Sequence, residues 1–249
     1  MIGADVNTMK IIDAVWEKRN LGVSCLELHF DNSDNADDVR KELSSLSLKE
    51  YNVARVPSSN TEVCRVIRES GFEFIEAAIT LTHDLKSISV RKGLEKLCES
   101  CSCAPMDDSD VEYMEAQIDK GIFATDRISV DPRFGKELSA RRYKLWMRDL
   151  ITQGNIPMKV MVKGTPVGFF ISRERSPKVY DGVLAGVYSE FEGTGMGYCV
   201  QYQGLVRTKE LGAKKYIGHI SGNNVPVGKI VLSLGFGLDE IEYIFIKHN

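Results

Sequence analysis

Residues 182–198 read Gly182-Val-Leu-Ala-Gly-Val-Tyr-Ser-Glu-Phe-Glu-Gly-Thr-Gly-Met-Gly-Tyr198, an apolar strand pattern that runs into a glycine-rich turn and then into a helical pattern. Three glycines, Gly193, Gly195 and Gly197, fall at the corner between strand and helix. Backbone N–H groups at such a corner can point at a phosphate, and the helix dipole adds to the attraction. The spacing matches neither the dinucleotide-binding pattern G-x-G-x-x-G nor the Walker loop. The stretch therefore predicts a phosphate-binding turn of another kind.

The composition is that of an ordinary globular protein. The chain has 249 residues, 43% of them hydrophobic and 27% charged, and can form one large domain or two small ones. Its net charge of −3 gives no sign of a nucleic-acid partner. No apolar run approaches the length of a membrane span, and the first residues lack the layout of a signal peptide. We therefore expect a cytoplasmic protein with no nucleic-acid or membrane partner.

Six cysteines raise the question of a metal site. Cys98, Cys101 and Cys103 cluster, whereas the other three stand singly and the four histidines are scattered. A zinc site normally takes four ligands in two pairs, and the sequence offers no second Cys/His pair. We expect reduced thiols and no metal.

The chain divides by pattern into two α/β parts. Residues 1–95 are predicted to form a small N-terminal α/β domain, the polar stretch 96–110 a linker, and residues 111–249 a second domain. The order strand, helix, Gly-Phe, strand occurs around Gly71-Phe72 and again around Gly235-Phe236, which suggests two related halves.

Hydrophobic periodicity and turn residues define the expected elements. Helices are predicted at 34–46, 61–70, 111–120, 136–153, 195–211 and 226–234, and strands at 25–30, 51–56, 72–83, 158–162, 167–172, 182–188, 216–221 and 240–247. The fold class is therefore α/β (α+β). We expect the last strand to lie open at residues 241–247, where it could pair across a homodimer interface.

These features resemble the GCN5-related N-acetyltransferase (GNAT) superfamily. Its acyl-CoA pyrophosphate loop, Gln/Arg-x-x-Gly-x-Gly/Ala, is similar to Glu192-Gly-Thr-Gly-Met-Gly197, and Val187, Glu190 and Phe191 resemble the Val-x-Pro-Glu-Tyr that precedes it. As in the superfamily, Asn224 stands eleven residues before a Gly-Phe pair, and residues 158–170 match the usual hairpin. The resemblance implies a mixed central sheet in which two parallel strands, 182–188 and 216–221, splay apart around the pantetheine arm of acetyl-CoA.

The resemblance also implies the residues that contact acetyl-CoA. Backbone groups of Ala185, Gly186 and Val187 are expected to bond the pantetheine arm, and one main-chain N–H to polarise the thioester oxygen. The pyrophosphate and neighbouring groups are expected to contact Glu192, Gly193, Thr194, Gly195, Met196, Gly197 and Asn224. Glu192 stands where Gln or Arg is usual, and Val231 where the superfamily usually has a Tyr that protonates the leaving thiolate.

His219 and Asn224 are the catalytic candidates. His219 lies near the end of a strand that flanks the gap, where it could act as acid or base; the alternative is a strand histidine satisfied by a neighbour. Asn224 is better placed to contact CoA or position a water than to act as a chemical catalyst. Tyr180, Asp181 and Glu190 are further candidates within reach.

A narrower resemblance concerns the acceptor. Residues 125–134, with Asp131-Pro-Arg-Phe134, and then Arg141-Arg-Tyr143 and Trp146 look like the dTDP-fucosamine N-acetyltransferase type. This implies an acceptor amine on a dTDP-linked 3- or 4-amino-dideoxyhexose, bound between the two domains. The implied substrate contacts are Arg127, Asp131, Arg133, Arg142 and Tyr180. Guanidinium groups suit phosphate oxygens, although each arginine could equally solvate a surface. The alternatives are another small amine or a peptide as acceptor, or a non-catalytic acyl-CoA-binding module.

Overall fold

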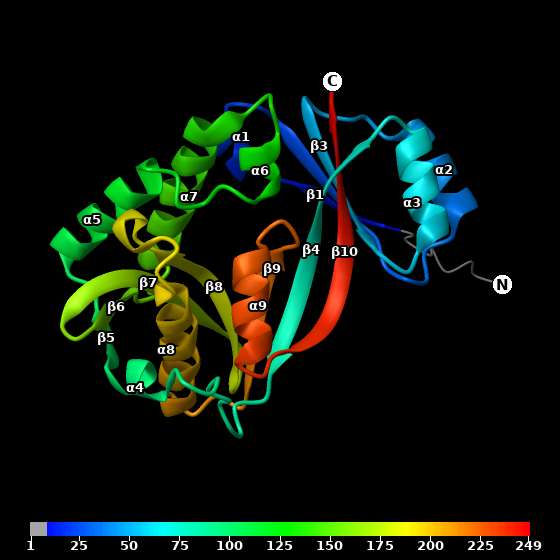
Figure 1. The fold of residues 1–249 in the computed structure, drawn as a ribbon. Helices are drawn as coiled ribbons and strands as arrows, with labels where there is room; N and C mark the ends of the chain where they lie inside the picture. The colour runs from blue at the N-terminus through cyan, green and yellow to red at the C-terminus, as the bar shows by residue number, and fades with distance from the viewer. Residues whose placement is uncertain (1–8) are drawn as a thin grey trace.

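The computed structural model describes residues 9–249 and contains one mixed β-sheet. Within that range, ten strands pair in the order β1-β2-β3-β10-β4-β9-β8-β7-β6-β5 (Figure 1). The strands are β1 (Lys10–Asp13), β2 (Cys25–His29), β3 (Tyr51–Pro57), β4 (Glu73–His83), β5 (Cys101–Pro105), β6 (Met158–Val162), β7 (Thr165–Ser176), β8 (Val179–Val187), β9 (Lys215–Ser221) and β10 (Gly237–His248). The predicted α/β class and mixed sheet are confirmed.

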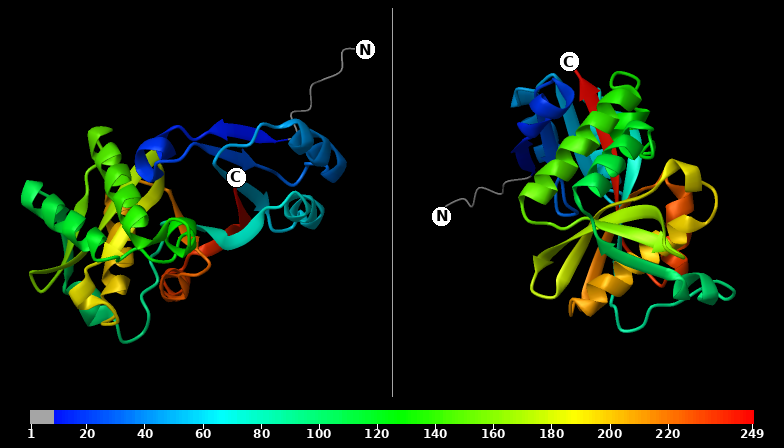
Figure 2. Two further views of the ribbon diagram at one scale, coloured as in Figure 1. Left: turned by 90° about the horizontal axis from the view of Figure 1, so that it is seen from above. Right: turned by 90° about the vertical axis from the view of Figure 1, so that its left-hand side faces the viewer.

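Helices cover both faces of this sheet (Figure 2). They are α1 (Trp16–Leu21), α2 (Ala36–Ser45), α3 (Thr61–Glu69), α4 (Glu95–Glu99), α5 (Asp108–Asp119), α6 (Arg127–Val130), α7 (Gly135–Thr152), α8 (Met196–Glu210) and α9 (Val225–Ser233). Helices α2, α3, α8 and α9 pack on one face, here named the α8 face. Helices α1, α5, α6 and α7 pack on the other, the α7 face. None of the helices in residues 9–249 has both the length and the apolar character needed to cross a membrane.

The structure contains an internal repeat, as the recurring Gly-Phe pattern predicts. The units β2-α2-β3-α3-β4 and β8-α8-β9-α9-β10 each hold a parallel strand pair. Asn60 caps α3 by accepting a hydrogen bond from the third N–H of that helix, and Asn224 caps α9 in the same way. Eleven residues after each asparagine, Gly71 (φ 83°) and Gly235 (φ 98°) end the helix in the left-handed region.

The two units exchange their last strands. Strand β10 lies between β3 and β4, and β4 lies between β10 and β9, so each unit completes the sheet of the other. The prediction of an open terminal strand at 241–247 is wrong, because β10 pairs on both sides along this stretch. Such a strand cannot extend a sheet across a dimer interface.

Several elements were absent from the sequence prediction. Residues 96–110 form most of α4, then β5 and the start of α5, and β5 pairs antiparallel with β6. The two-domain division stays a prediction, but one continuous sheet crosses it. Strand β1 and helices α1, α4 and α6 have four to six residues, too few to produce a clear periodicity.

Candidate functional site

Strands β8 and β9 form a gap that opens toward their carboxyl ends. They pair in parallel over four positions, from Val179↔Lys215 to Gly182↔Gly218, and not beyond. Strand β8 then continues to Val187 beside β7, while β9 continues to Ser221 beside β4. The predicted splay of two parallel strands is therefore confirmed, with its vertex at Gly182 and Gly218.

Backbone groups of β8 face this gap. The Tyr188 N–H donates to the Val167 carbonyl on β7 (3.0 Å). Because inward and outward groups alternate along an antiparallel strand, Ala185 and Val187 direct their N–H and C=O to the opposite edge, toward the gap. Gly186 between them has no room for a side chain, since a Cβ there would lie 2.9 Å from the Phe169 ring.

The glycine-rich turn lies at the open end of the gap. Gly193 (φ 74°) and Gly195 (φ 85°) adopt left-handed conformations, and a Cβ at either position would meet only open space. No side chain caps α8, and within the described chain the N–H groups of Gly193, Gly195, Met196 and Gly197 have no acceptor. Four free donors at the positive end of a 15-residue helix fit a diphosphate.

The other predicted donor contacts lie around this turn. Glu192 and Thr194 are exposed, and the Thr194 hydroxyl donates to the Phe191 carbonyl (2.6 Å). Met196 and Val187 are partly buried and pack against the same hydrophobic cluster, while Gly197 approaches Ile230 of α9. The Asn224 side chain accepts from the Val227 N–H (3.3 Å), so helix capping accounts for its side-chain oxygen.

His219 and Asp181 lie beside the vertex on the α7 face of the sheet. Thr80 Oγ1 is 3.3 Å from His219 Nδ1, across the antiparallel pair of β4 and β9. Removal of water from part of the imidazole lowers the pKa of His219, an effect that the negative charge of Asp181 opposes. A neutral imidazole in this place can accept a proton.

Asp181 is almost completely buried and incompletely paired. Its Oδ2 lies 3.4 Å from Arg173 Nη2, whereas Oδ1 has no hydrogen-bond partner among the described residues and lies 3.7 Å from Arg175 Nη1. The sequence pointed to Asp181 only as one alternative of several. The paired glycines one residue beyond it are the signal that marks the vertex.

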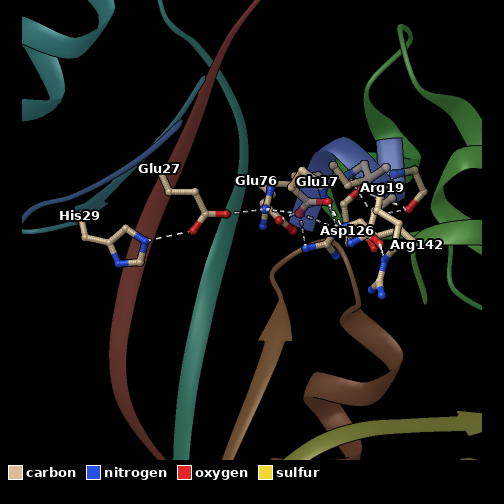
Figure 3. A network of polar contacts seen from close by, with 11 residues as sticks. Glu17, Arg19, Glu27, His29, Glu76, Asp126 and Arg142 are labelled. Atoms are coloured by element: carbon tan, nitrogen blue, oxygen red, sulfur yellow. Dashed lines mark hydrogen bonds and ion pairs between the residues drawn. The ribbon is translucent and has the colours of Figure 1, made fainter. Parts of the chain in front are cut away.

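Arg127 and Arg142 lie in an interior ion-pair network (Figure 3). Arg127 Nη2 is 2.9 Å from Glu27 Oε1, and Arg142 Nη2 is 2.8 Å from Glu17 Oε1. Glu17 is fully buried, and Arg127 also lies 3.8 Å from it. The network joins β2 to α1, α6 and α7. It accounts for both arginines without a substrate.

The remaining predicted substrate residues are dispersed. Asp131 is buried and accepts from His248 Nε2 (2.7 Å) and from the Arg133 N–H (2.9 Å), while the Arg133 side chain is exposed. Tyr180 packs on the α8 face with the cluster that holds Tyr216 and Leu234. Through the contact between Asp131 and His248, the Asp-Pro-Arg-Phe motif therefore connects the start of α7 to the end of β10.

Val231 lies in a hydrophobic cluster, and Cys98, Cys101 and Cys103 lie away from the glycine-rich turn. Val231 is buried in the cluster between α8, α9 and β9, and has no polar group to offer. Cys98, Cys101 and Cys103 line a hollow of about 490 Å³ beside α8, remote from the glycine turn. In residues 9–249, His, Cys, Asp and Glu side chains form no group of three or more that could hold a metal ion.

Comparison with known proteins rests on three-dimensional structure. No protein-family model matches the chain, and no curated protein matches its sequence. A GCN5-related N-acetyltransferase from Sphaerobacter thermophilus superposes with a TM-score of 0.64 at 9% identity, covering 96% of this chain and 76% of that one. A conserved protein of unknown function from Staphylococcus epidermidis superposes with 0.65 at 16% identity, covering 100% and 93%.

A third similar structure is a GCN5-related glucosamine N-acetyltransferase region of a fungal multi-domain GH3 β-N-acetylglucosaminidase. Its TM-score is 0.59 at 12% identity, and the match covers 96% of this chain and 31% of that one. At identities this low, the superpositions show the fold alone. The reaction has to be argued from the residues that line the gap. The chain has the fold of the GCN5-related N-acetyltransferases.

Proposed function

We propose that the protein is an acetyl-CoA-dependent N-acetyltransferase. The observation that supports this most is the combination of an uncapped helix with free N–H donors and a strand whose Ala185 and Val187 backbone groups face an open gap. The N-terminus of α8 offers hydrogen-bond donors for a diphosphate. The edge of β8 offers backbone groups that can pair with an extended, amide-containing arm. Bound acetyl-CoA would supply an acetyl group as a thioester that an amine can attack directly.

Different residues of the chain would have different roles in such a transfer. A main-chain N–H of Ala185 or Val187 donates to the thioester oxygen as negative charge develops there, and loss of one donor of this kind costs about 10²–10³ in rate. The α7 face leaves His219 accessible beside the vertex, where its neutral imidazole can take the proton of the amine. Fixing donor and acceptor in one geometry supplies much of the remaining acceleration.

For the acceptor we propose an amino sugar, specifically a dTDP-linked 3- or 4-amino-dideoxyhexose. The support is the sequence resemblance of residues 125–146, together with a fungal structure of the same fold described as a glucosamine N-acetyltransferase region. Another small amine or a peptide is the second candidate. It is favoured by the ion pairs of Arg127 and Arg142, which leave these arginines no free charge for a nucleotide diphosphate.

A thiol-release assay with acetyl-CoA tests the function and separates these acceptors. The panel contains dTDP-amino sugars, free amino sugars, polyamines and peptides with a free amino terminus. Turnover with dTDP-amino sugars supports the full proposal, and turnover with polyamines or peptides alone excludes the sugar nucleotide. Binding of CoA with no turnover on any amine favours a non-catalytic acyl-CoA-binding module. Absence of CoA binding contradicts the proposed function itself.

A further inference from the structure

Thiols meet where the edge strand β5 packs against helix α8 (Figure 1). All six cysteines of the chain are free in the structure. Cys101 and Cys103 belong to β5, Cys199 belongs to the start of α8, and the three pack in one hydrophobic cluster. Cys101 and Cys103 also line the hollow of about 490 Å³ beside α8. This contact between strand and helix therefore has thiols on both of its sides.

Helix α8 directs Cys199 toward Cys101. Gln203 Nε2 donates a hydrogen bond to the Cys101 carbonyl (3.0 Å), so this face of α8 lies against the start of β5. Cys199 comes four residues before Gln203 and therefore lies on the same face of the helix, where it is completely buried. The thiols of Cys101 and Cys199 form a hydrogen bond with each other. The two sulfur atoms are thus direct neighbours, although 98 residues separate them in the sequence.

Two other cysteines are near enough to be considered as partners of Cys101. Cys98-Glu-Ser-Cys101 has the spacing of a dithiol motif, but in such motifs the N-terminus of a helix favours the thiolate. Cys98 instead lies at the end of α4, where the helix dipole disfavours a thiolate. Cys103 has no hydrogen bond with another cysteine in residues 9–249. The thiol contact therefore selects Cys199.

We propose that hydrogen peroxide converts Cys101 and Cys199 into a reversible disulfide. In the first step the Cys101 sulfur is oxidised to a sulfenic acid, the oxygen–oxygen bond of the peroxide breaks and one water is released. The Cys199 sulfur then attacks the Cys101 sulfur, the sulfur–oxygen bond breaks and a second water leaves. Two thiols and one peroxide thus give one disulfide and two waters. A thiol reductant reverses the change by exchange.

Exposure determines which thiol reacts first. Cys101 is half-buried and lines the hollow, where a molecule as small as hydrogen peroxide can reach it, whereas Cys199 is completely buried. Burial raises the pKa of both thiols, so only a small fraction is thiolate at neutral pH. The first step should therefore be slow at neutral pH, and mildly alkaline solution is the right condition for a test.

The disulfide would join two elements that carry different parts of the molecule. Strand β5 is the edge strand beside β6, and Cys199 lies three residues after Met196, the first residue of α8. The bond would hold the helix whose N-terminus offers donors for a diphosphate against the edge of the sheet. It requires no CoA and no acceptor, so it is independent of the proposed function.

Counting thiols and mapping the linked peptides test the proposal. Hydrogen peroxide is added to the folded wild type at mildly alkaline pH, and free thiols are counted after denaturation. We expect the count to fall by two, from six to four, and dithiothreitol to restore it. Tryptic digestion without reductant should give one linked pair, residues 97–120 with residues 179–207, which contain Cys101 and Cys199.

Variants identify the sulfur atoms in the link. Cys101→Ser changes a half-buried thiol and should abolish the link, and Cys199→Ala should do the same from the other side. Cys103→Ser is the matched control, because Cys103 lines the same hollow two residues along β5, and it should still lose two thiols. Cys98→Ser should also behave like the wild type.

The outcomes decide the assignment. Six thiols retained by the peroxide-treated wild type would overturn the proposal, and so would a link that persists in Cys101→Ser. A bond between Cys98 and Cys101, which leaves the two tryptic peptides separate, would also overturn it. So would a loss of thiols that dithiothreitol does not restore, because this indicates oxidation beyond the sulfenic acid. The assay contains no CoA, so none of these results bears on acetyl transfer.

Discussion

The two halves of the repeat have the same order of elements and differ at the place where a donor would bind. In the N-terminal half, β2 and β3 stay paired from Cys25↔Tyr51 to His29↔Arg55, and the Phe30 N–H still donates to the Arg55 carbonyl (3.0 Å). In the C-terminal half, pairing ends at Gly182↔Gly218 and leaves a gap. A parallel pair that stays closed offers no free backbone groups to an extended ligand.

The turn that follows the first strand of each unit, before α2 and before α8, also differs between the halves. Asn35 Oδ1 accepts from the Asp37 and Asp38 N–H groups, so a side chain satisfies the first turn of α2. Asp31 and Asp34 add negative charge to that turn. The equivalent turn before α8 has glycines and no cap. Only the C-terminal unit therefore combines an uncapped helix with separated strands, the two features on which the proposed CoA site depends.

The largest expected effect is loss of donor binding on Gly195→Asp. The substitution places a carboxylate beside the free N–H groups and a side chain at φ 85°, so CoA affinity should fall by about 100-fold or more. Gly212→Asp is the matched control, because Gly212 has φ 84° and open space at the other end of α8. Calorimetry with CoA compares the two. Equal affinity in both variants would refute the turn as the phosphate site.

Next in size is the stability lost on Glu17→Gln. Glu17 is fully buried between Arg142 and Arg127, and neutralising it leaves these charges without their shared partner. Urea denaturation should show a loss of about 3 kcal/mol in the free energy of unfolding. Glu62→Gln, which breaks an exposed pair with Arg65, is the control and should have no measurable effect. A loss smaller than 1 kcal/mol at Glu17 would show that the network contributes little to stability.

Glu27 makes the same network sensitive to acid. Burial opposes ionisation of this carboxyl, but the hydrogen bond from His29 and the charge of Arg127 outweigh it and lower the pKa of Glu27 to about 2. Its contribution to stability is present above its unfolded value near 4.5 and is lost as pH falls from there to about 2. Stability curves of wild type and Glu27→Gln should converge over this interval. If the two stability curves stay parallel between pH 4.5 and 2, the pKa of Glu27 is not lowered in the folded protein.

The two capping asparagines give a smaller effect that compares the halves directly. Asn60→Ala and Asn224→Ala each remove an equivalent cap, so each should cost about 1 kcal/mol in unfolding free energy. Only Asn224 lies at the gap, so any change in CoA affinity should be confined to Asn224→Ala. Equal stability losses with unchanged CoA affinity would limit Asn224 to capping.

The smallest expected effect is a gain at Glu192. This exposed carboxylate lies next to the turn that would hold two phosphates, and Glu192→Gln should tighten CoA about threefold at low salt. Glu174→Gln on β7, another exposed carboxylate, serves as the control. A gain that persists in high salt would show that charge is not its cause.

The sequence predicts the fold well where patterns are long and local. Residues 136–153 and 195–211 differ from α7 and α8 by at most two residues at each end, and the hairpin turn appears with Lys163 (φ 50°) and Gly164 (φ 80°). The exchange of β4 and β10 is invisible to such patterns, because strand order depends on pairing between distant segments. An expected edge strand is therefore central in the sheet.

The same distinction between local patterns and long-range contacts applies to the candidate site. The glycine turn and the strand 182–188 are local, and they lie together at one end of the gap. Arg127 and Arg142 look like phosphate ligands in the sequence because the sequence does not show that Glu27 and Glu17, 100 and 125 residues away, lie opposite them.

Hydrogen–deuterium exchange with and without CoA tests the central claim most directly, because it examines both halves in one experiment. We predict that CoA protects the amides of Ala185, Val187 and residues 193–197, and leaves exchange at residues 30–38 unchanged. Protection of residues 30–38, or unchanged exchange at both sites when CoA is bound, would contradict it.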